Sequence, residues 1–207
     1  MKQKERQERS RQQILQAALA EFGIHNYEDV TMEKICAAHG ISKGMMYHYY
    51  ANKDELFLLC VQNIFDKLRI HLETQAAVLA SQDPLERIQN YFLIRECYFR
   101  QHPMEKKIFE NALFRTPQHL KDEIAALRRP LRDMNLHFLQ QIIHELALRP
   151  CIDYAEAIHY LEAVEDIFWG LLAQYSPPGE AIDLHRQTAA ARRLVELLLF
   201  GVLRQAL

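Results

Sequence analysis

The sequence predicts an all-α protein of about nine helices, arranged as a small N-terminal head and a larger helical body. Glycine is scarce, with 6 in 207 residues, and so are the Asn-Gly and Asp-Gly pairs that turn β-hairpins. Apolar residues recur at spacings of three and four along almost the whole chain, which is the period of a helix. Within about 2 to 4 residues, the helices are expected at 9–24, 31–39, 42–49, 53–80, 84–101, 103–115, 117–149, 153–175 and 184–205.

The starts of these helices carry capping signals. A Ser, Thr, Asp or Asn side chain accepts a hydrogen bond from the first free amides of a helix, and such residues stand before predicted helices at Thr31, Ser42, Asn52, Asp83 and Asp153. The last three are followed by Glu three residues later, which is the pattern of a capping box. Pro84 takes a first-turn position, where its missing amide proton is not needed.

The first three helices form a head with the spacing of a helix-turn-helix. Only His39-Gly40-Ile41 separates the second helix from the third, and Gly40 suits the left-handed position at a helix end. Val30 and Ile41 each precede a cap, and we expect them to pack on Ile35 and Met46 one turn further on. The inward residues of the head are predicted to be Ile14, Ala18, Phe22, Met32, Ile35, Cys36, Met46 and Tyr50.

The third helix has an outer face that is suited to DNA. Because Met46 and Tyr50 fill its inward positions, its outer residues are Lys43, Gly44, Met45, Tyr47, His48 and Tyr49. A helix fits the major groove, where its first residues meet base edges while basic and hydroxyl side chains hold phosphates. Lys53 opens the next helix, where its charge and the free amides can share one phosphate. The alternative is that the three ring side chains pack on a neighbouring helix.

The charge distribution limits how this head would bind nucleic acid. The net charge is −2, so any contact must come from a local patch rather than from bulk positive charge. Residues 1–53 contain eight Lys or Arg against six acids, and five of these bases lie within the first eleven residues. A basic arm of this kind is also typical of a solvated, disordered tail.

Composition argues against several other classes of protein. Hydrophobic residues make up 49% and charged residues 25%, as in an ordinary globular protein. The apolar run at 194–203 is shorter than the roughly 18 to 20 residues that cross a membrane, and the charged N-terminus is unlike a signal peptide, so a cytoplasmic location is expected. Without a Gly-rich phosphate loop, a nucleophile elbow or paired cysteines, we expect neither an enzyme nor a cofactor.

The stretch TMEKICAAHGISKGMMYHYYANKDELF, from Thr31 to Phe57, resembles the signature of the TetR family of transcription regulators. The family's first helix is matched as well, by Ile14, Ala17, Ala18, Phe22 and Gly23. The resemblance implies a helix-turn-helix DNA-binding domain at 8–68, with its motif at 31–50. It implies a ligand-binding and dimerisation domain at 69–207, where the family has no common motif.

The same resemblance implies roles for single residues. Phosphate contacts would come from Thr31, Lys43, Tyr47, His48 and Lys53, and base contacts from Gly44 and Met45. This chain has Met45 where the family usually has a small or hydroxylated residue, and Tyr50 where it usually has Phe. A thioether offers a base an apolar contact rather than a hydrogen bond.

Two C-terminal stretches carry more apolar surface than one core needs. An apolar stripe runs from Leu161 to Tyr175, and residues 194–203 are apolar almost all round, which predicts burial on both sides. In the family that this chain resembles, the last two long helices form the dimer interface. Candidate dimer contacts are therefore Leu161, Phe168, Leu172, Leu194 and Leu198. A purely intramolecular core is the alternative.

The helix at 84–101 gathers aromatic residues and one charge along one side. With aromatics from later helices, it suggests an effector pocket lined by Tyr91, Arg95, Tyr98, Phe99, His102, Phe138 and Trp169; a filled aromatic core is the alternative. A charge among aromatics must be paired, so Arg95 meets either an acid such as Glu162 or an anionic ligand. His137 and His144, seven residues apart, are weak evidence for a metal site, and no metal is expected.

Together these features predict a regulator that binds a palindromic double-stranded DNA operator as a homodimer, represses transcription and responds to a small-molecule effector. An activator, or a helical adaptor whose head binds another partner, is the alternative. Salt discriminates between DNA and other partners, because neutralising phosphates makes affinity fall steeply as salt rises.

Overall fold

The computed structural model describes residues 2–79, 82–163 and 197, and the regular elements of this part of the chain are helices. The all-α prediction is therefore confirmed. The chain divides into two compact units, one made of residues 1–68 and 99–129 and the other of residues 69–98 and 130–207.

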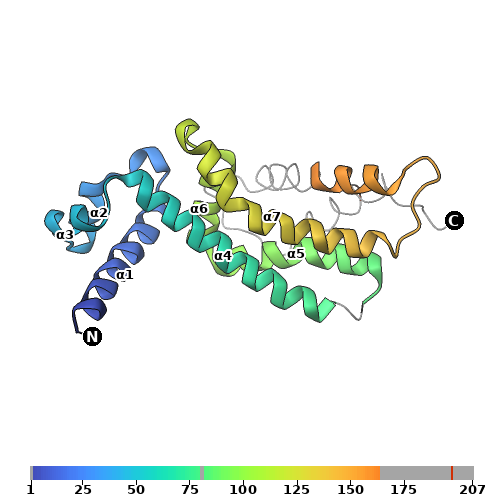
Figure 1. Ribbon diagram of the computed structural model, residues 1–207, viewed down its shortest axis with the longest axis horizontal. Coiled ribbons are helices and arrows are strands. Elements are labelled where there is room, and N and C mark those ends of the chain that lie inside the picture. Colours follow the sequence, from blue (N-terminus) through green and yellow to red (C-terminus); the bar gives the residue numbers. More distant parts are fainter. Residues whose placement is uncertain (1, 80–81, 164–196, 198–207) are drawn as a thin grey trace. The chain divides into compact units, whose positions relative to one another are not determined.

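Short loops connect the helices (Figure 1). In order along the chain, the α-helices and the short 3-10 helices (η) are α1 (Lys2–Phe22), η1 (Tyr27–Asp29), α2 (Met32–His39), α3 (Lys43–Tyr49), α4 (Lys53–Leu79), α5 (Pro84–Gln101), α6 (Pro103–Phe114), η2 (Gln118–Leu120) and α7 (Lys121–Ile143). A further helix starts at residue 154 and is described as far as residue 163. The helix predicted at 184–205, and the predicted helix at 153–175 beyond residue 163, lie outside the described residues.

Two elements differ from their predicted ranges by more than a few residues. α1 begins at Lys2 rather than near residue 9. Lys, Gln, Glu and Arg are good helix formers, but a segment made of them has no apolar residues whose spacing could predict the helix. The helix predicted at 117–149 is η2 followed by α7, which ends at Ile143. After that residue the amides of Glu145 and Leu146 bond to carbonyls three residues back, so the chain tightens into a turn.

The first unit contains the predicted head, with an apolar core between α1, α2, α3 and the start of α4. All the inward residues predicted for it are buried except Tyr50, which is half-buried. Phe57 of α4 is fully buried with them, and its ring centre lies 5.0 Å from that of Phe22. The helical period therefore identified most of the core residues of α1, α2 and α3, but not Phe57 of α4.

The turn between α2 and α3 is fixed by caps at both of its ends. Gly40 ends α2 in the left-handed region, with φ 64° and ψ 28°, where a side chain would be strained. The Ser42 hydroxyl oxygen accepts a hydrogen bond from the Met45 amide at 3.1 Å and so caps α3. Ile41, between them, is buried. The direction in which α3 leaves the turn is thereby set.

Within the first unit, residues 23–26 lie along α6. A Cβ at Gly23 would come within 2.7 Å of both the Leu19 carbonyl oxygen and the Met104 Cβ, so only glycine fits this close approach. The Asn26 side-chain oxygen accepts hydrogen bonds from Lys107 at 2.9 Å and from Arg115 at 2.8 Å. Asn111 donates to the His25 carbonyl oxygen at 3.2 Å.

Tyr27 ties η1 to α4 and η2. Its hydroxyl donates to the Asp54 carboxylate, and the other oxygen of that carboxylate lies 3.1 Å from Nε2 of His119. Burial, followed by the hydrogen bond to Asp54, raises the pKa of Tyr27 above its ordinary value, so the phenol stays protonated and remains a donor.

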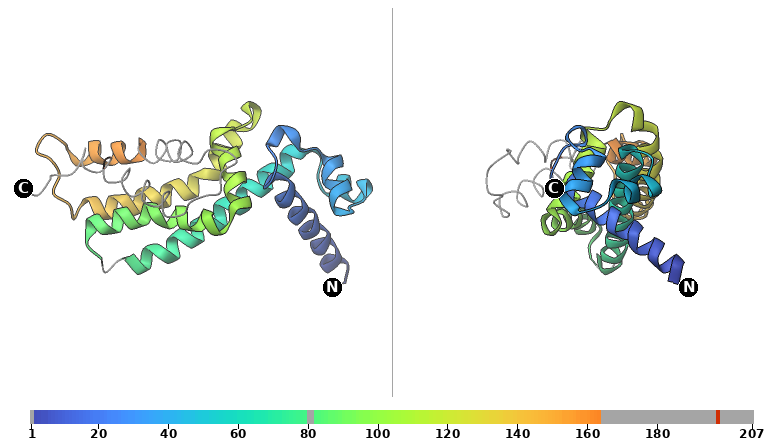
Figure 2. Two further views of the ribbon diagram at one scale, coloured as in Figure 1. Left: turned by 180° about the vertical axis from the view of Figure 1, so that it is seen from behind. Right: turned by 90° about the vertical axis from the view of Figure 1, so that its left-hand side faces the viewer.

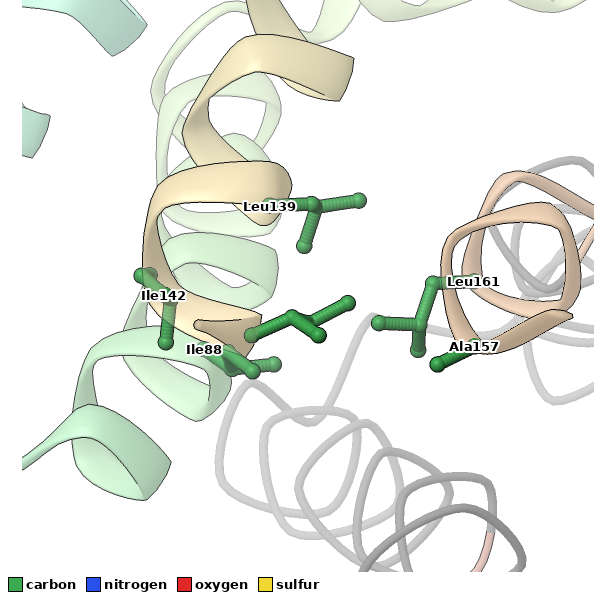
Figure 3. Packing of buried hydrophobic residues seen from close by; sticks show 6 residues of the cluster. Ile88, Leu139, Ile142, Ala157 and Leu161 are labelled. Carbon is green, nitrogen blue, oxygen red and sulfur yellow. The ribbon is translucent and has the colours of Figure 1, made fainter. Parts of the chain in front are cut away.

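The second unit has its own apolar core between α5, α7 and the helix from residue 154 (Figure 3). Its fully or nearly fully buried members are Ile88, Leu139, Ile142, Ile143, Ala157 and Leu161. The Asp153 carboxylate accepts from the Glu156 amide at 2.8 Å, and Glu156 accepts from the Asp153 amide at 3.1 Å. This is the reciprocal capping box that the sequence predicted.

We predict opposite effects of alanine at two glycines of the head. Gly40→Ala should lower the free energy of unfolding by about 1–2 kcal/mol, because it places a Cβ in the left-handed region. Gly44→Ala should not lower it, because nothing lies within 4 Å of a Cβ there and alanine is the better helix former. Urea unfolding followed by circular dichroism measures both, and equal losses would contradict the role given to Gly40.

Candidate nucleic-acid interface

α3 presents six residues that are not needed by the core, and we call them the reading face: Lys43, Gly44, Met45, Tyr47, His48 and Tyr49. Met46, on the opposite side of the helix, is fully buried, while Met45 and Tyr49 are half-buried and the other four are exposed. The predicted alternative, in which Tyr47, His48 and Tyr49 pack on a neighbouring helix, does not hold for Tyr47 and His48. One basic residue, three rings and an open glycine thus share one surface.

Thr31 caps α2 close to the reading face. Its hydroxyl oxygen accepts a hydrogen bond from the Lys34 amide at 3.2 Å, and its side chain is half-buried. Since a hydroxyl can accept and donate at once, the same hydroxyl also donates to the Glu33 carboxylate and helps to lower the pKa of Glu33. A phosphate oxygen at Thr31 would therefore compete with Glu33 for the hydroxyl proton.

Tyr47 is held by an acid that sequence reasoning missed. Its side chain is 49% exposed, and its hydroxyl donates to Oε1 of Glu33 on α2 at 2.9 Å. Hydrogen bonds from its own backbone amide and from Tyr47 lower the pKa of Glu33, while the bond to the carboxylate raises the pKa of Tyr47. The interface therefore carries a fixed negative charge next to a predicted phosphate contact.

Two lysines near the reading face hold the backbone that precedes α2. Nζ of Lys53 donates to the carbonyls of Tyr27 at 3.1 Å and Val30 at 3.3 Å, and it lies 4.1 Å from the centre of the Tyr27 ring. Nζ of Lys34 donates to the Asp29 carbonyl at 2.6 Å. Because an ammonium has three protons, Lys53 keeps one for an external acceptor. Its other two protons stabilise the backbone between η1 and α2.

The aromatic end of the reading face is contacted from α1. The ring of Tyr49 lies edge-on to His48, with 4.8 Å between the ring centres. The guanidinium carbon of Arg11 lies 5.8 Å from the centre of the Tyr49 ring, within the range of a cation–π contact.

Of the residues predicted to line an effector pocket, four lie in the described part of the second unit. The Tyr91 ring stacks on Phe138 with 3.9 Å between ring centres, and its hydroxyl donates to Asn135. Arg95 and Tyr98 are buried. The Arg95 side chain is not unpaired, because it interacts with at least one other group. Glu162, one acid suggested for Arg95, lies 3.4 Å from Arg132 instead.

Of the other residues predicted for the pocket and the dimer interface, three lie in the described part of the chain. Phe99 belongs to the first unit, where it packs on Phe109, and His102 is exposed before α6. Leu161 is only 1% exposed within the core of the second unit, so we do not retain it as a dimer contact. Outside the described residues lie Phe168, Trp169, Leu172, Leu194 and Leu198.

The two histidines considered for a metal site, His137 of α7 and His144 directly after it, contact other side chains instead. His137 lies 3.0 Å from the Gln141 amide nitrogen, and His144 stacks on Tyr154 with 3.9 Å between ring centres. No group of three or more potential metal ligands occurs among the residues that the structure describes. None of the described helices is long and apolar enough to span a membrane.

Known proteins are similar to this chain both in the helix-turn-helix region and over most of its length. Residues 14–60 match the family described as bacterial regulatory proteins, tetR family. The HTH-type transcriptional repressor AcnR of Corynebacterium diphtheriae is 26% identical over 176 residues, which cover 85% of this chain and 86% of AcnR. The HTH-type transcriptional repressor KstR2 of Mycobacterium tuberculosis is 25% identical over 170 residues, or 82% of each protein.

Solved structures share the fold over nearly the whole length. NalD of Pseudomonas aeruginosa, described as the secondary repressor of the MexAB-OprM multidrug efflux pump, has a TM-score of 0.67 and 21% identity, over 98% of this chain and 100% of NalD. The ketosteroid transcriptional regulator KstR2 of Mycobacterium tuberculosis has a TM-score of 0.62 and 21% identity, over 94% of this chain and 95% of KstR2.

We predict that Glu33→Gln tightens binding to duplex DNA of any sequence. Glutamine keeps an oxygen that accepts from the Tyr47 hydroxyl but removes the charge that repels phosphates, so affinity at low salt should rise several-fold. Fluorescence anisotropy with one fixed duplex measures this. Glu28→Gln is the matched control, because it makes the same change of charge at an exposed residue on η1; an equal gain in both variants would contradict a local role for Glu33.

Proposed function

The chain belongs to the TetR family of bacterial regulatory proteins, and we propose that it represses transcription by binding a palindromic operator as a homodimer until a small-molecule effector releases it. The observation that carries this proposal is the reading face, an exposed surface on a helix whose direction is fixed by the Gly40 turn and the Ser42 cap. The head at 8–68 binds DNA, and the body at 69–207 dimerises and binds the effector.

On the reading face we assign the first residues to bases and the others to phosphates. Gly44 leaves open space above the backbone for close approach, and Met45 provides an apolar contact, suited to a thymine methyl group. Phosphates are held by Lys43, Tyr47, His48 and Tyr49 of α3, together with Thr31 and Lys53.

The dimer interface is proposed at the C-terminal end of the chain. Support comes from the apolar run at 194–203 and from Leu197, whose side chain is 66% exposed. A leucine this exposed in an apolar run is suited to a partner subunit. The proposed contacts are Phe168, Leu172, Leu194 and Leu198, and a two-fold dimer would place its reading helices about 34 to 36 Å apart, one turn of DNA.

The effector site is proposed in the second unit. Support comes from the buried side chains of Tyr91, Arg95 and Tyr98 and from the half-buried Phe138, which stacks on Tyr91; to these we add Trp169. Such a site suits an apolar ligand with a few polar anchors. Effector binding would change the separation of the two heads, and the operator affinity would fall by the differential affinity of the effector for the two states.

We predict that the purified protein enriches a palindrome from a randomised duplex pool. At two salt concentrations the affinity for the enriched duplex should fall steeply as salt rises, since each neutralised phosphate adds about 0.9 to the slope of log K against log salt. Absence of enrichment at both salts would contradict operator binding and would favour an adaptor whose head binds another partner.

Variants of the reading face should then separate phosphate from base contacts. Tyr47→Ala should weaken binding to the operator and to a scrambled duplex by the same factor, because phosphates carry no sequence. Met45→Ala should instead change the preferred base at one position of each half-site, measured by repeating the selection. Lys53→Ala should lower stability as well as affinity, because it also frees two carbonyls; unchanged affinity in folded Tyr47→Ala and Lys53→Ala would contradict these assignments.

A further inference from the structure

The N-terminal half of α1 is an exposed, strongly charged helix rather than a disordered arm. Side chains 3–9 are all exposed, and the first buried one is Ile14. Bases stand at Lys4, Arg6, Arg9 and Arg11. Figures 1 and 2 show this end of α1 on the same side of the first unit as α3.

The bases of α1 lie on two different faces of the helix. Residues seven apart are two turns apart on one face, so Lys4 and Arg11 share a face. The contact between Arg11 and the Tyr49 ring shows that this face is the one beside α3. Arg6 and Arg9 lie on another face, next to Glu5, which is four residues before Arg9. Glu8 is four residues after Lys4 and three before Arg11, so it lies on their face and, like Arg11, influences the Tyr50 hydroxyl. The charges of Lys4, Arg11 and Glu8 sum to +1.

The reading face by itself offers DNA little positive charge. Lys34 and Lys53 both direct Nζ to backbone carbonyls, and Lys43 is opposed by the ionised Glu33, whose pKa it helps to lower. The net charge of the whole chain is −2, so the duplex gains no general attraction either. Lys43 and the remaining proton of Lys53 are the cationic groups that this surface offers to phosphates, so a basic neighbouring element adds to its affinity for them.

We propose that the Lys4–Arg11 face of α1 is a second DNA-binding surface, which holds phosphates beside the base pairs read by α3. The proposal rests on the proposed function, because it takes the duplex on α3 as given. Its occupant is DNA because the face carries positive charge, continues the reading face through Tyr49, and lies on an ordered helix. It adds affinity and salt dependence without sequence preference.

The test uses the full-length protein with the enriched operator and a scrambled duplex across a salt series. The variant Lys4→Gln/Arg11→Gln should reduce the slope of log K against log salt by about 0.9 for each phosphate that the protein no longer neutralises. It should weaken binding to both duplexes by the same factor, so that the ratio of the two affinities is unchanged. Lys4→Gln alone leaves the Arg11–Tyr49 contact in place and should give about half of the change in slope.

The matched control is Arg6→Gln/Arg9→Gln, which removes the same charge from the other face of the same helix. A smaller change in slope for this control supports the proposal. Equal slopes for the two double variants, or no change from the wild type, would overturn it while leaving the proposed function intact. Wild-type protein that binds neither duplex would instead contradict the proposed function.

Discussion

The left-handed turn at Gly40, with a capped helix on each side, is the constraint on which the reading face depends. α3 has 7 residues, far fewer than an isolated helix needs in water. Its order comes from the Ser42 cap and from the burial of Ile41 and Met46. Because these residues stabilise the helix from its inner side, the outer side chains of α3 are available to a ligand. A substitution that disturbs the turn therefore affects recognition without touching DNA.

The reading face carries little positive charge that is free to contact DNA. Lys34 and Lys53 stabilise the backbone before α2, and Glu33 both holds Tyr47 and repels phosphates. Non-specific binding to DNA is almost entirely electrostatic, so a reading face with little free positive charge binds random duplexes weakly. Under the proposed function, occupancy of an operator would then depend on base contacts, on the second subunit and on the additional phosphate contacts proposed for α1.

The features that the sequence predicted are those encoded within a few residues. The caps at Thr31 and Ser42 and the capping box at Asp153 depend on neighbours three residues away, and the inward residues of the head follow the helical period. The hydrogen bond from Tyr47 to Glu33 and the contacts that link Tyr27, Asp54 and His119 join separate helices. A pattern of neighbouring residues in the sequence therefore could not predict them. Leu161 shows a related limit, because periodicity identifies an apolar face but not whether the same chain or a partner covers it.

Hydrogen bonds attach the head to α6 with a strength that is compatible with the effector response we propose. His25 and Asn26 receive hydrogen bonds from Lys107, Asn111 and Arg115, and an average intramolecular bond contributes about 0.5–1.5 kcal/mol net. The group therefore contributes on the scale of a typical coupling free energy between two binding sites, about 1–3 kcal/mol. Apolar packing adds to these bonds, because Gly23 approaches Met104 closely and the Phe65 ring of α4 lies 5.9 Å from that of Phe109 on α6. Polar bonds of this strength can be exchanged while the apolar core between α1, α2 and α3 keeps the reading face intact.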